Sequence, residues 1–243
     1  MKMHNTLFKQ IAKLGLLLLL TLAISACIVY IPKPNTSMSW KEEVLLHDGS
    51  KIISHRFYTL YGGYGTQQGA VIDETVTFNL PNGKSIVWKS DYSDSVPEPN
   101  GLSHFYFDII NGVPYLATYP AGCIAYNKWN RPNPPQVLLK YRDNQWQRIT
   151  LAELPSELIN AQANVIVGNP DRSLLKPFYD VTAVNTKNAP ITTLEYKTIL
   201  REPVKVGCEE LVFYKGTWVG SGDSIGKRMM DSRDKKLNKG DSK

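Results

Sequence analysis

Five turn-forming residue pairs, each set between runs rich in Val, Ile, Thr and aromatic residues, constrain the fold of this chain most strongly. They are Asp48-Gly49, Asn82-Gly83, Asn111-Gly112, Asp143-Asn144 and Lys215-Gly216. Asn-Gly and Asp-Gly between strand-like runs strongly favour a β-hairpin, because the turn needs positive φ angles that Gly and Asn tolerate. The sequence therefore predicts five hairpins, over residues 43–58, 74–88, 104–118, 137–149 and 210–219.

Hairpins in series predict a mainly β fold, an antiparallel meander that forms a sandwich or an open barrel. Helix is sparse, and we expect one or two short helices. Residues 151–163 carry leucines near helical spacing, but Pro155 limits them to a short amphipathic helix. Residues 173–179 and 192–200 fit either strand or helix.

The N-terminal residues have the order of an export signal. The first residues include three lysines, Lys2, Lys9 and Lys13, and no Asp or Glu. An apolar run from Leu14 to Leu22 follows them. A basic segment, an apolar segment and then small residues is the arrangement that the export machinery reads.

The four residues after this run, Ile24, Ser25, Ala26 and Cys27, resemble the lipobox of bacterial lipoprotein precursors. The resemblance implies cleavage before Cys27, whose thiol then carries diacylglycerol, with palmitate-type acyl chains holding the protein in the lipid bilayer. Ile28 follows the cysteine, where the aspartate that retains such proteins in an inner membrane would stand. In a host with two membranes, the resemblance therefore implies the outer one, with the domain facing the periplasm.

Two other readings of the N-terminus stay open. Cleavage after Ser25 satisfies an ordinary small-x-small signal and releases a protein without lipid. Alternatively, the apolar stretch continues to Ile31 and forms an uncleaved membrane helix of barely sufficient length. From Trp40 onward, and most in GVPYLATYPAGCIAYNKWNRPNPP, the chain resembles uncharacterised bacterial lipoproteins, which implies secretion and anchoring and no activity.

Cysteine usage agrees with export. The chain has three cysteines, and lipidation of Cys27 leaves Cys123 and Cys208 as a pair. An oxidising compartment allows them to form a disulfide. The alternative is two buried free thiols.

The positive charge of the chain lies at its ends. The leader has three lysines, and the tail has seven basic residues against three aspartates, so a net charge of +6 leaves −1 for residues 27–225. A near-neutral body does not indicate nucleic-acid binding. We expect a signal peptide at 1–26, a lipidated tether at 27–39, one β-rich domain at 40–225 and a basic disordered tail at 226–243.

Residues 119–135 differ from the hairpin pattern, because this segment combines aromatic residues, side-chain amides and prolines. We expect an ordered loop, since prolines cannot sit in a central strand. Aromatic faces beside hydrogen-bonding groups suit a sugar ring or a peptide, so Tyr119, Tyr126, Trp129 and Arg131 are candidate binding residues for an envelope glycan or protein. The alternative is a structural loop whose aromatic residues cover one end of a sheet.

No motif with specific catalytic, cofactor or metal-binding spacing follows the leader. Gly222, Asp223 and Ser224 resemble the nucleophile block of some lipases and esterases, but stand beside the tail. His47, His55 and His104 are scattered in the sequence. We therefore expect a binding or interaction module of the envelope. The alternative is a periplasmic hydrolase that uses Ser224 or an acid–histidine pair that the sequence does not reveal.

Overall fold

A computed structural model describes residues 36–62, 69–93, 99–168 and 171–240. The chain divides into a unit at Met1–Lys33 and a compact unit at Pro34–Lys243, to which every described residue belongs. The signal sequence and Cys27 with its lipobox lie outside the described residues.

The first sheet has five strands in the order β4-β3-β2-β1-β9. Its strands are β1 (Thr36–Leu45), β2 (Lys51–Leu60), β3 (Val71–Asn79), β4 (Ser85–Lys89) and β9 (Phe178–Tyr179). Neighbours pair antiparallel from β1 to β4, and only the short β9 runs parallel to β1.

The second sheet has four strands in the order β5-β6-β7-β8, and a third has two, β10-β11. Their bounds are β5 (Leu102–Ile110), β6 (Val113–Pro120), β7 (Val137–Arg142), β8 (Gln145–Ile149), β10 (Leu211–Tyr214) and β11 (Thr217–Gly220). Asn111 and Gly112 have φ angles of 51° and 76° in the β5–β6 turn, as a tight hairpin requires. All five predicted hairpins, and with them the predicted mainly β fold, are confirmed.

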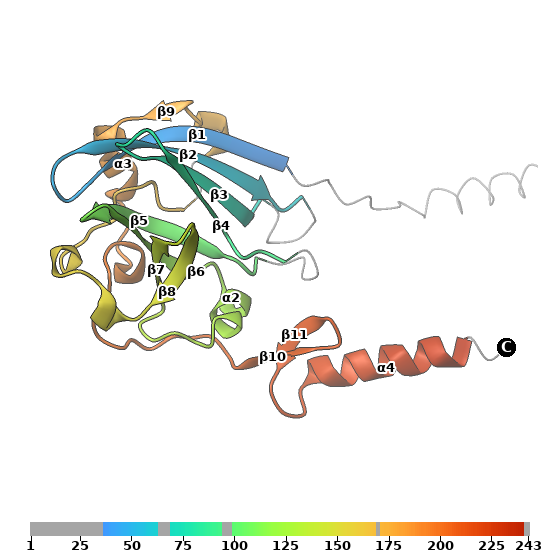
Figure 1. Cartoon of the computed structure of the whole chain (residues 1–243). Coiled ribbons are helices and arrows are strands. Elements are labelled where there is room, and N and C mark those ends of the chain that lie inside the picture. The colour runs from blue at the N-terminus through green and yellow to red at the C-terminus, as the bar shows by residue number, and fades with distance from the viewer. Residues whose placement is uncertain (1–35, 63–68, 94–98, 169–170, 241–243) are drawn as a thin grey trace, which may run out of the picture. The chain divides into compact units, whose positions relative to one another are not determined.

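The main core lies between the two larger sheets, which Figure 1 shows as stacked layers. Phe78 of β3 and Phe107 of β5 stack across it with ring centroids 3.9 Å apart. Side chains alternate along each strand, so every second residue of β1, β2 and β3 faces this layer. The arrangement is that of a sandwich, one of the two predicted forms.

Segments between β8 and β10 cover the remaining apolar surfaces. The stretch at 151–163, where a short amphipathic helix limited by Pro155 is expected, forms two 3₁₀ helices, Leu151–Glu153 and Ser156–Leu158. Pro155 separates them, because its ring prevents helical hydrogen bonding across that position. The buried Leu158 packs with the outward-facing side chains of the second sheet, Phe105 among them.

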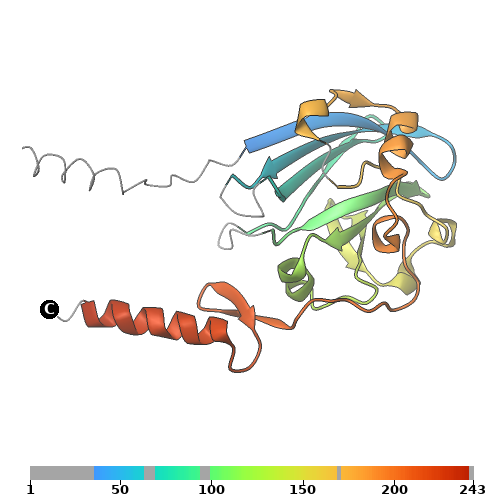
Figure 2. The same ribbon diagram turned by 180° about the vertical axis from the view of Figure 1, so that it is seen from behind.

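The two stretches that fitted either strand or helix contain short pieces of both. Residues 172–179 hold a 3₁₀ helix, Arg172–Leu174, and then β9, and a further 3₁₀ helix spans Leu194–Tyr196. The sequence analysis did not predict α3 (Val181–Asn188), which Asp180 caps. Figure 2 shows these orange segments running along one side of both sheets.

The predicted loop at 119–135 contains a short helix, α2 (Cys123–Lys128). Cys123 at its start forms a disulfide with Cys208, with Cα atoms 5.2 Å apart, so the predicted bridge is confirmed. The side chain of Asn127 donates to the carbonyl of Glu209 and accepts from the amide of Leu211. The disulfide and these hydrogen bonds attach the β10–β11 hairpin to α2.

The C-terminal segment differs from the expected disordered tail, because Ile225–Gly240 forms the helix α4. It contains no proline, and Asp231 and Asp234 both pair with Lys215 of the preceding turn at 2.6 Å. These pairs link the helix to the hairpin and give it tertiary support that the sequence pattern did not reveal. None of the helices within the described ranges has the length and apolar character needed to cross a bilayer.

Candidate functional site

The structure brings acidic and histidine side chains together at two places. One is a sealed ionic cluster in the core between the sheets. The other is a histidine–aspartate pair at the edge of the sandwich, beside a pocket. The two differ in their access to solvent.

Arg56 is the centre of the sealed cluster. Its guanidinium donates to Oε1 of Glu74 from Nη2 at 2.6 Å and from Nε at 3.1 Å, and to Oε1 of Glu42 from Nη1 at 3.3 Å. It also donates to the hydroxyl of Tyr58 and the carbonyl of Ile166. Arg56, Glu42 and Glu74 are all fully buried, so each charge depends on these partners in place of water.

His104 completes the cluster from β5. Its Nδ1 lies 2.8 Å from Oε1 of Glu74, and its backbone amide donates to Oε2. Burial raises the pKa of Glu74, but the attraction and hydrogen bonds of His104 and Arg56 outweigh that effect and lower the pKa to about 2. The other nitrogen, Nε2, has no hydrogen-bond partner among the described residues. Because His104 is fully buried, this pair joins the two sheets and offers no surface to a substrate.

The second pair, His47 and Asp108, lies at the β1–β2 turn. Asp108 is fully buried and accepts four hydrogen bonds: from Nδ1 and the backbone amide of His47, from the hydroxyl of Tyr106, and from its neighbour Ile109. The distance from Nδ1 to Oδ1 is 2.8 Å. A proton on Nδ1 directed at the carboxylate leaves Nε2 of the imidazole as the free acceptor.

His47 differs from His104 in the solvent exposure of its imidazole. The side chain of His47 is 30% exposed while that of Asp108 is 0% exposed, so only the histidine reaches solvent. The hydrogen bond to Asp108 raises the pKa of His47; burial opposes this, and the negative charges of Asp108, Asp48 and Glu157 add to it. A buried acid orienting an accessible imidazole is the arrangement of a hydrogen-bonding or general-base histidine.

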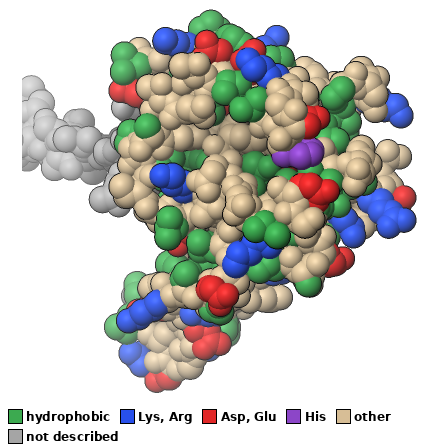
Figure 3. Space-filling view, turned by 90° about the vertical axis from the view of Figure 1, so that its left-hand side faces the viewer, with side chains coloured by type: hydrophobic (Ala, Val, Ile, Leu, Met, Phe, Trp, Pro, Cys, Tyr) green, Lys and Arg blue, Asp and Glu red, His purple; other side chains and the backbone are tan. Residues whose placement is uncertain are grey.

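A pocket of about 310 Å³ opens beside His47. Segments 157–164 and α3 supply most of the remaining lining, which includes Glu157, Asn160, Gln162 and Asn185. No Lys or Arg lines it. Figure 3 views the side of the domain where the β1–β2 turn lies, and shows a histidine among hydrophobic and acidic side chains. The pocket therefore offers amide and imidazole groups and little charge.

The aromatic residues predicted as a binding loop make contacts within the chain. The indole of Trp129 donates to Asp91 at 2.6 Å, and Tyr126 is almost fully buried under the guanidinium of Arg131. Tyr119 packs against Tyr196, with ring centroids 4.5 Å apart.

Arg131 joins this loop to the segment before β10. It donates to the backbone carbonyls of Cys208 and Glu209 and to the side chain of Asn127. Binding of a ligand at the loop stays a prediction, and the contacts of these side chains within the chain favour the structural alternative.

Ser224 lies at the start of α4, where its Oγ accepts the backbone amide of Lys227 at 3.3 Å. That is the role of a helix-capping side chain. Of the three scattered histidines, His47 and His104 have acidic partners, and His55 is exposed on β2 opposite Lys41 and Thr77. Ser224 has no histidine partner among the described residues.

Sequence reasoning missed both acid–histidine pairs, although the sequence contains a signal for each. Three charged residues, Glu42, Arg56 and Glu74, occupy every-second-residue positions within mostly apolar stripes, where an unpaired charge is costly. Asp108 interrupts the apolar strand HFYFDII in the same way. A charge at a core-facing strand position implies a partner, but the partner's identity comes only from the fold.

No family model, curated protein or solved structure matches this chain.

Proposed function

We propose that this protein is an exported lipoprotein, anchored by acylated Cys27 in the outer membrane and facing the periplasm. Its sandwich domain acts as a binding module of the cell envelope and catalyses no reaction. The anchor fixes where the domain works, and the pocket beside His47 is where it takes its ligand.

The disulfide is the observation that carries the anchor. Of the three cysteines, Cys123 and Cys208 are joined, so the remaining thiol is the one in the lipobox position, Cys27. A disulfide indicates an oxidising compartment, which the proposed export provides. The export signal and the cysteine pairing are independent features of the chain, and both favour the envelope.

Intact mass of the protein extracted from membranes tests the anchor. We expect a chain that begins at Cys27 and carries diacylglycerol and further acyl mass. Two thiols should become alkylatable only after reduction. A lipid-free chain that begins at Ala26, or an uncleaved chain, contradicts the lipoprotein proposal.

The chemistry of the pocket favours a neutral ligand with many hydroxyl groups, such as an envelope saccharide. Asn160, Gln162 and Asn185 present side-chain amides, which donate and accept hydrogen bonds, and His47 adds an imidazole. An anionic ligand is disfavoured, because no Lys or Arg lines the pocket and Glu157 does. The buried carboxylate of Asp108 holds the imidazole in one orientation, which reduces the entropy cost of binding.

Titration with neutral oligosaccharide fragments made of N-acetylglucosamine, followed by the NMR signals of the imidazoles, tests this site. We expect the His47 signals to shift on binding, and His47→Gln to weaken binding roughly tenfold, the value of one hydrogen bond of about 1.4 kcal/mol. His55→Gln, at an exposed position on β2, is the matched control and should bind as the wild type. Equal binding by the two variants excludes the pocket.

Hydrolysis is the second candidate function, and the His47–Asp108 pair is the observation that favours it. In such an enzyme, Nε2 of His47 accepts the proton of a water molecule that attacks the ligand, and Asp108 stabilises the imidazolium. Turnover of the same fragments, with a rate that falls when His47 is protonated, would establish the enzyme. Ser224→Ala should leave that turnover unchanged, because Ser224 is a helix cap.

A further inference from the structure

One face of α4 is exposed and combines apolar with basic side chains. Ile225, Arg228, Met229, Ser232 and Arg233 line a shallow groove made by this helix alone. Their spacing of three and four residues places them on a single face. Ile225 and Met229 are 69% and 68% exposed, which is high for apolar side chains.

The charges of the helix are segregated around this face. Both acidic residues of α4, Asp231 and Asp234, bind Lys215 of the hairpin turn. The ammonium of Lys227 lies over the ring of Tyr214, also in the hairpin. The hairpin therefore engages both acids of the helix.

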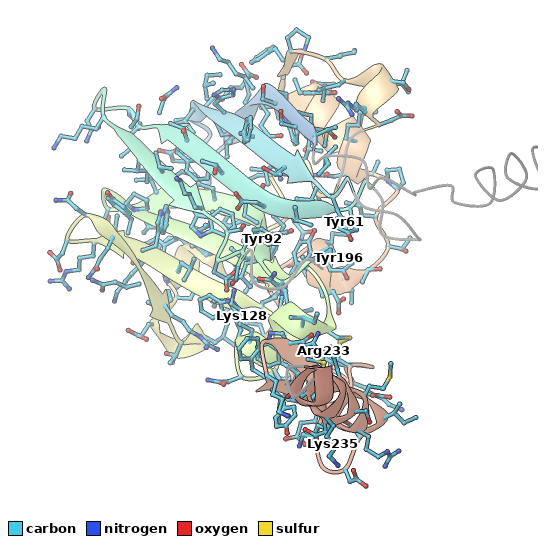
Figure 4. The ribbon with its side chains drawn as sticks, turned by 90° about the vertical axis from the view of Figure 1, so that its right-hand side faces the viewer. Tyr61, Tyr92, Lys128, Tyr196, Arg233 and Lys235 are labelled. Atoms are coloured by element: carbon cyan, nitrogen blue, oxygen red, sulfur yellow. A yellow bond between two sulfur atoms is a disulfide. The ribbon has the colours of Figure 1, made fainter. Side chains whose placement is uncertain are left out.

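The groove itself contains two arginines and no acidic residue. Arg228 makes an exposed pair with Asp223, a surface contact of small energy. Figure 4 looks along α4 and shows Arg233 and Lys235 on different sides of the helix, so positive charge also lies beyond the groove. Across its whole length α4 has six Lys or Arg residues against two Asp residues.

We propose that this face of α4 lies on an anionic lipid surface. Ile225 and Met229 enter the headgroup region, and Arg228 and Arg233 contact lipid phosphates. A basic helix with an apolar face is the form in which helices bind such surfaces, and charge complementarity selects anionic lipid over a neutral one.

The proposed anchor, on which this inference rests for its setting, makes even a weak contact effective. From Cys27 to Thr36, where β1 begins, the chain reaches at most about 30 Å. The domain is therefore confined near the bilayer, and the helix acts at a high effective concentration of lipid. The helix–lipid contact fixes the orientation of the domain, which the lipid anchor alone does not determine.

Vesicle sedimentation of the mature chain from Cys27 with Cys27→Ala tests the helix without the acyl chains. We expect it to bind vesicles of mixed phosphatidylglycerol and phosphatidylcholine, to lose binding as salt is raised, and not to bind pure phosphatidylcholine. Arg228→Gln with Arg233→Gln should weaken binding roughly tenfold or more, since each basic residue contributes about a fivefold factor. Ile225→Ser with Met229→Ser should weaken it to a similar extent.

Matched controls separate this face from general charge and hydrophobicity. Lys51→Gln with Arg142→Gln removes the same charge from other hairpins, and Leu174→Ser with Leu194→Ser removes apolar groups that are also exposed. Neither should reduce binding by more than about twofold. Equal loss in controls and α4 variants, no binding to anionic vesicles, or self-association of the chain through Met229 overturns the proposal. The mass of the membrane-extracted protein tests the anchor separately.

Discussion

Replacing Arg56 by Met should destabilise the domain far more than the loss of one ion pair at the surface. The substitution leaves Glu42 and Glu74 charged and buried without their cation. Removing one partner of a buried pair costs about 3–5 kcal/mol, because the remaining charge cannot be solvated. The pKa of Glu74, lowered from 4.5 to about 2, agrees in direction: the attraction and hydrogen bonds of His104 and Arg56 exceed the cost of burying the carboxylate by a net of about 3 kcal/mol.

The loss of unfolding free energy in Arg56→Met should depend on pH, and the buried charges of the cluster determine the direction of this dependence. In the wild type, Glu74 contributes stability at all pH values above 4.5, and this is lost as the pH falls through about 2. In Arg56→Met, burial without the guanidinium raises the pKa of Glu74, so this carboxyl group takes up a proton at mildly acidic pH and its burial becomes less costly. The difference in unfolding free energy between variant and wild type should therefore be smaller at about pH 5 than at pH 7.

Urea unfolding at both pH values measures this difference. Lys51→Met is the matched control, because it breaks the exposed pair with Glu43 and should cost less than 1 kcal/mol. If Arg56→Met does not fold, adding Glu42→Gln and Glu74→Gln should restore folding by removing the uncompensated charges. A loss below about 1 kcal/mol for Arg56→Met, or the same loss at pH 5 and pH 7, would refute the reasoning.

Three further predictions concern single features. Because the pKa of His47 is raised, its contact with the buried carboxylate stabilises the fold below pH 6.5, and this stabilisation is lost as the pH rises through the folded-state pKa. Urea unfolding should therefore show a difference in unfolding free energy between wild type and His47→Gln that disappears at alkaline pH. Replacing Cys123 and Cys208 by Ser opens a loop with a sequence separation of 85 and should lower the unfolding free energy by about 4 kcal/mol, measured with and without reductant on the wild type. Trp129→Ala removes a half-buried ring and its hydrogen bond, so calorimetry should show a loss of about 2 kcal/mol; an unchanged melting temperature with weaker glycan retention would instead favour the binding loop.

The sequence predicted the local elements well where turn chemistry decides them. Each predicted turn lies where two antiparallel strands meet, since each pair contains a Gly or an Asn that adopts a positive φ angle without help from the rest of the chain. Prediction was weaker between β8 and β10, where Pro155 splits one stretch and α3 depends on packing of Val184 against the first sheet. α4 was missed for the same reason, because its support comes from Lys215 in the hairpin.

The candidate site could not be predicted from the sequence. His47 and Asp108 are separated by 61 positions along the chain, and His104 and Glu74 by 30. Nothing in their spacing selects these partners over other acids. The contacts form because β5 packs against the β1–β3 layer, which places each histidine beside a buried carboxylate.

What the sequence by itself determined is therefore the set of hairpins and the mainly β class, because each depends on residue type. The pairing of Cys123 with Cys208 was predicted with two free thiols as the alternative, and the structure decided between them. What only the tertiary structure decided is which charges are buried and which are accessible. The stacking of two sheets seals Arg56 and His104 in the core and leaves His47 at the edge. Burial is a property of the packed layers, and the same residue types acquire different roles from it.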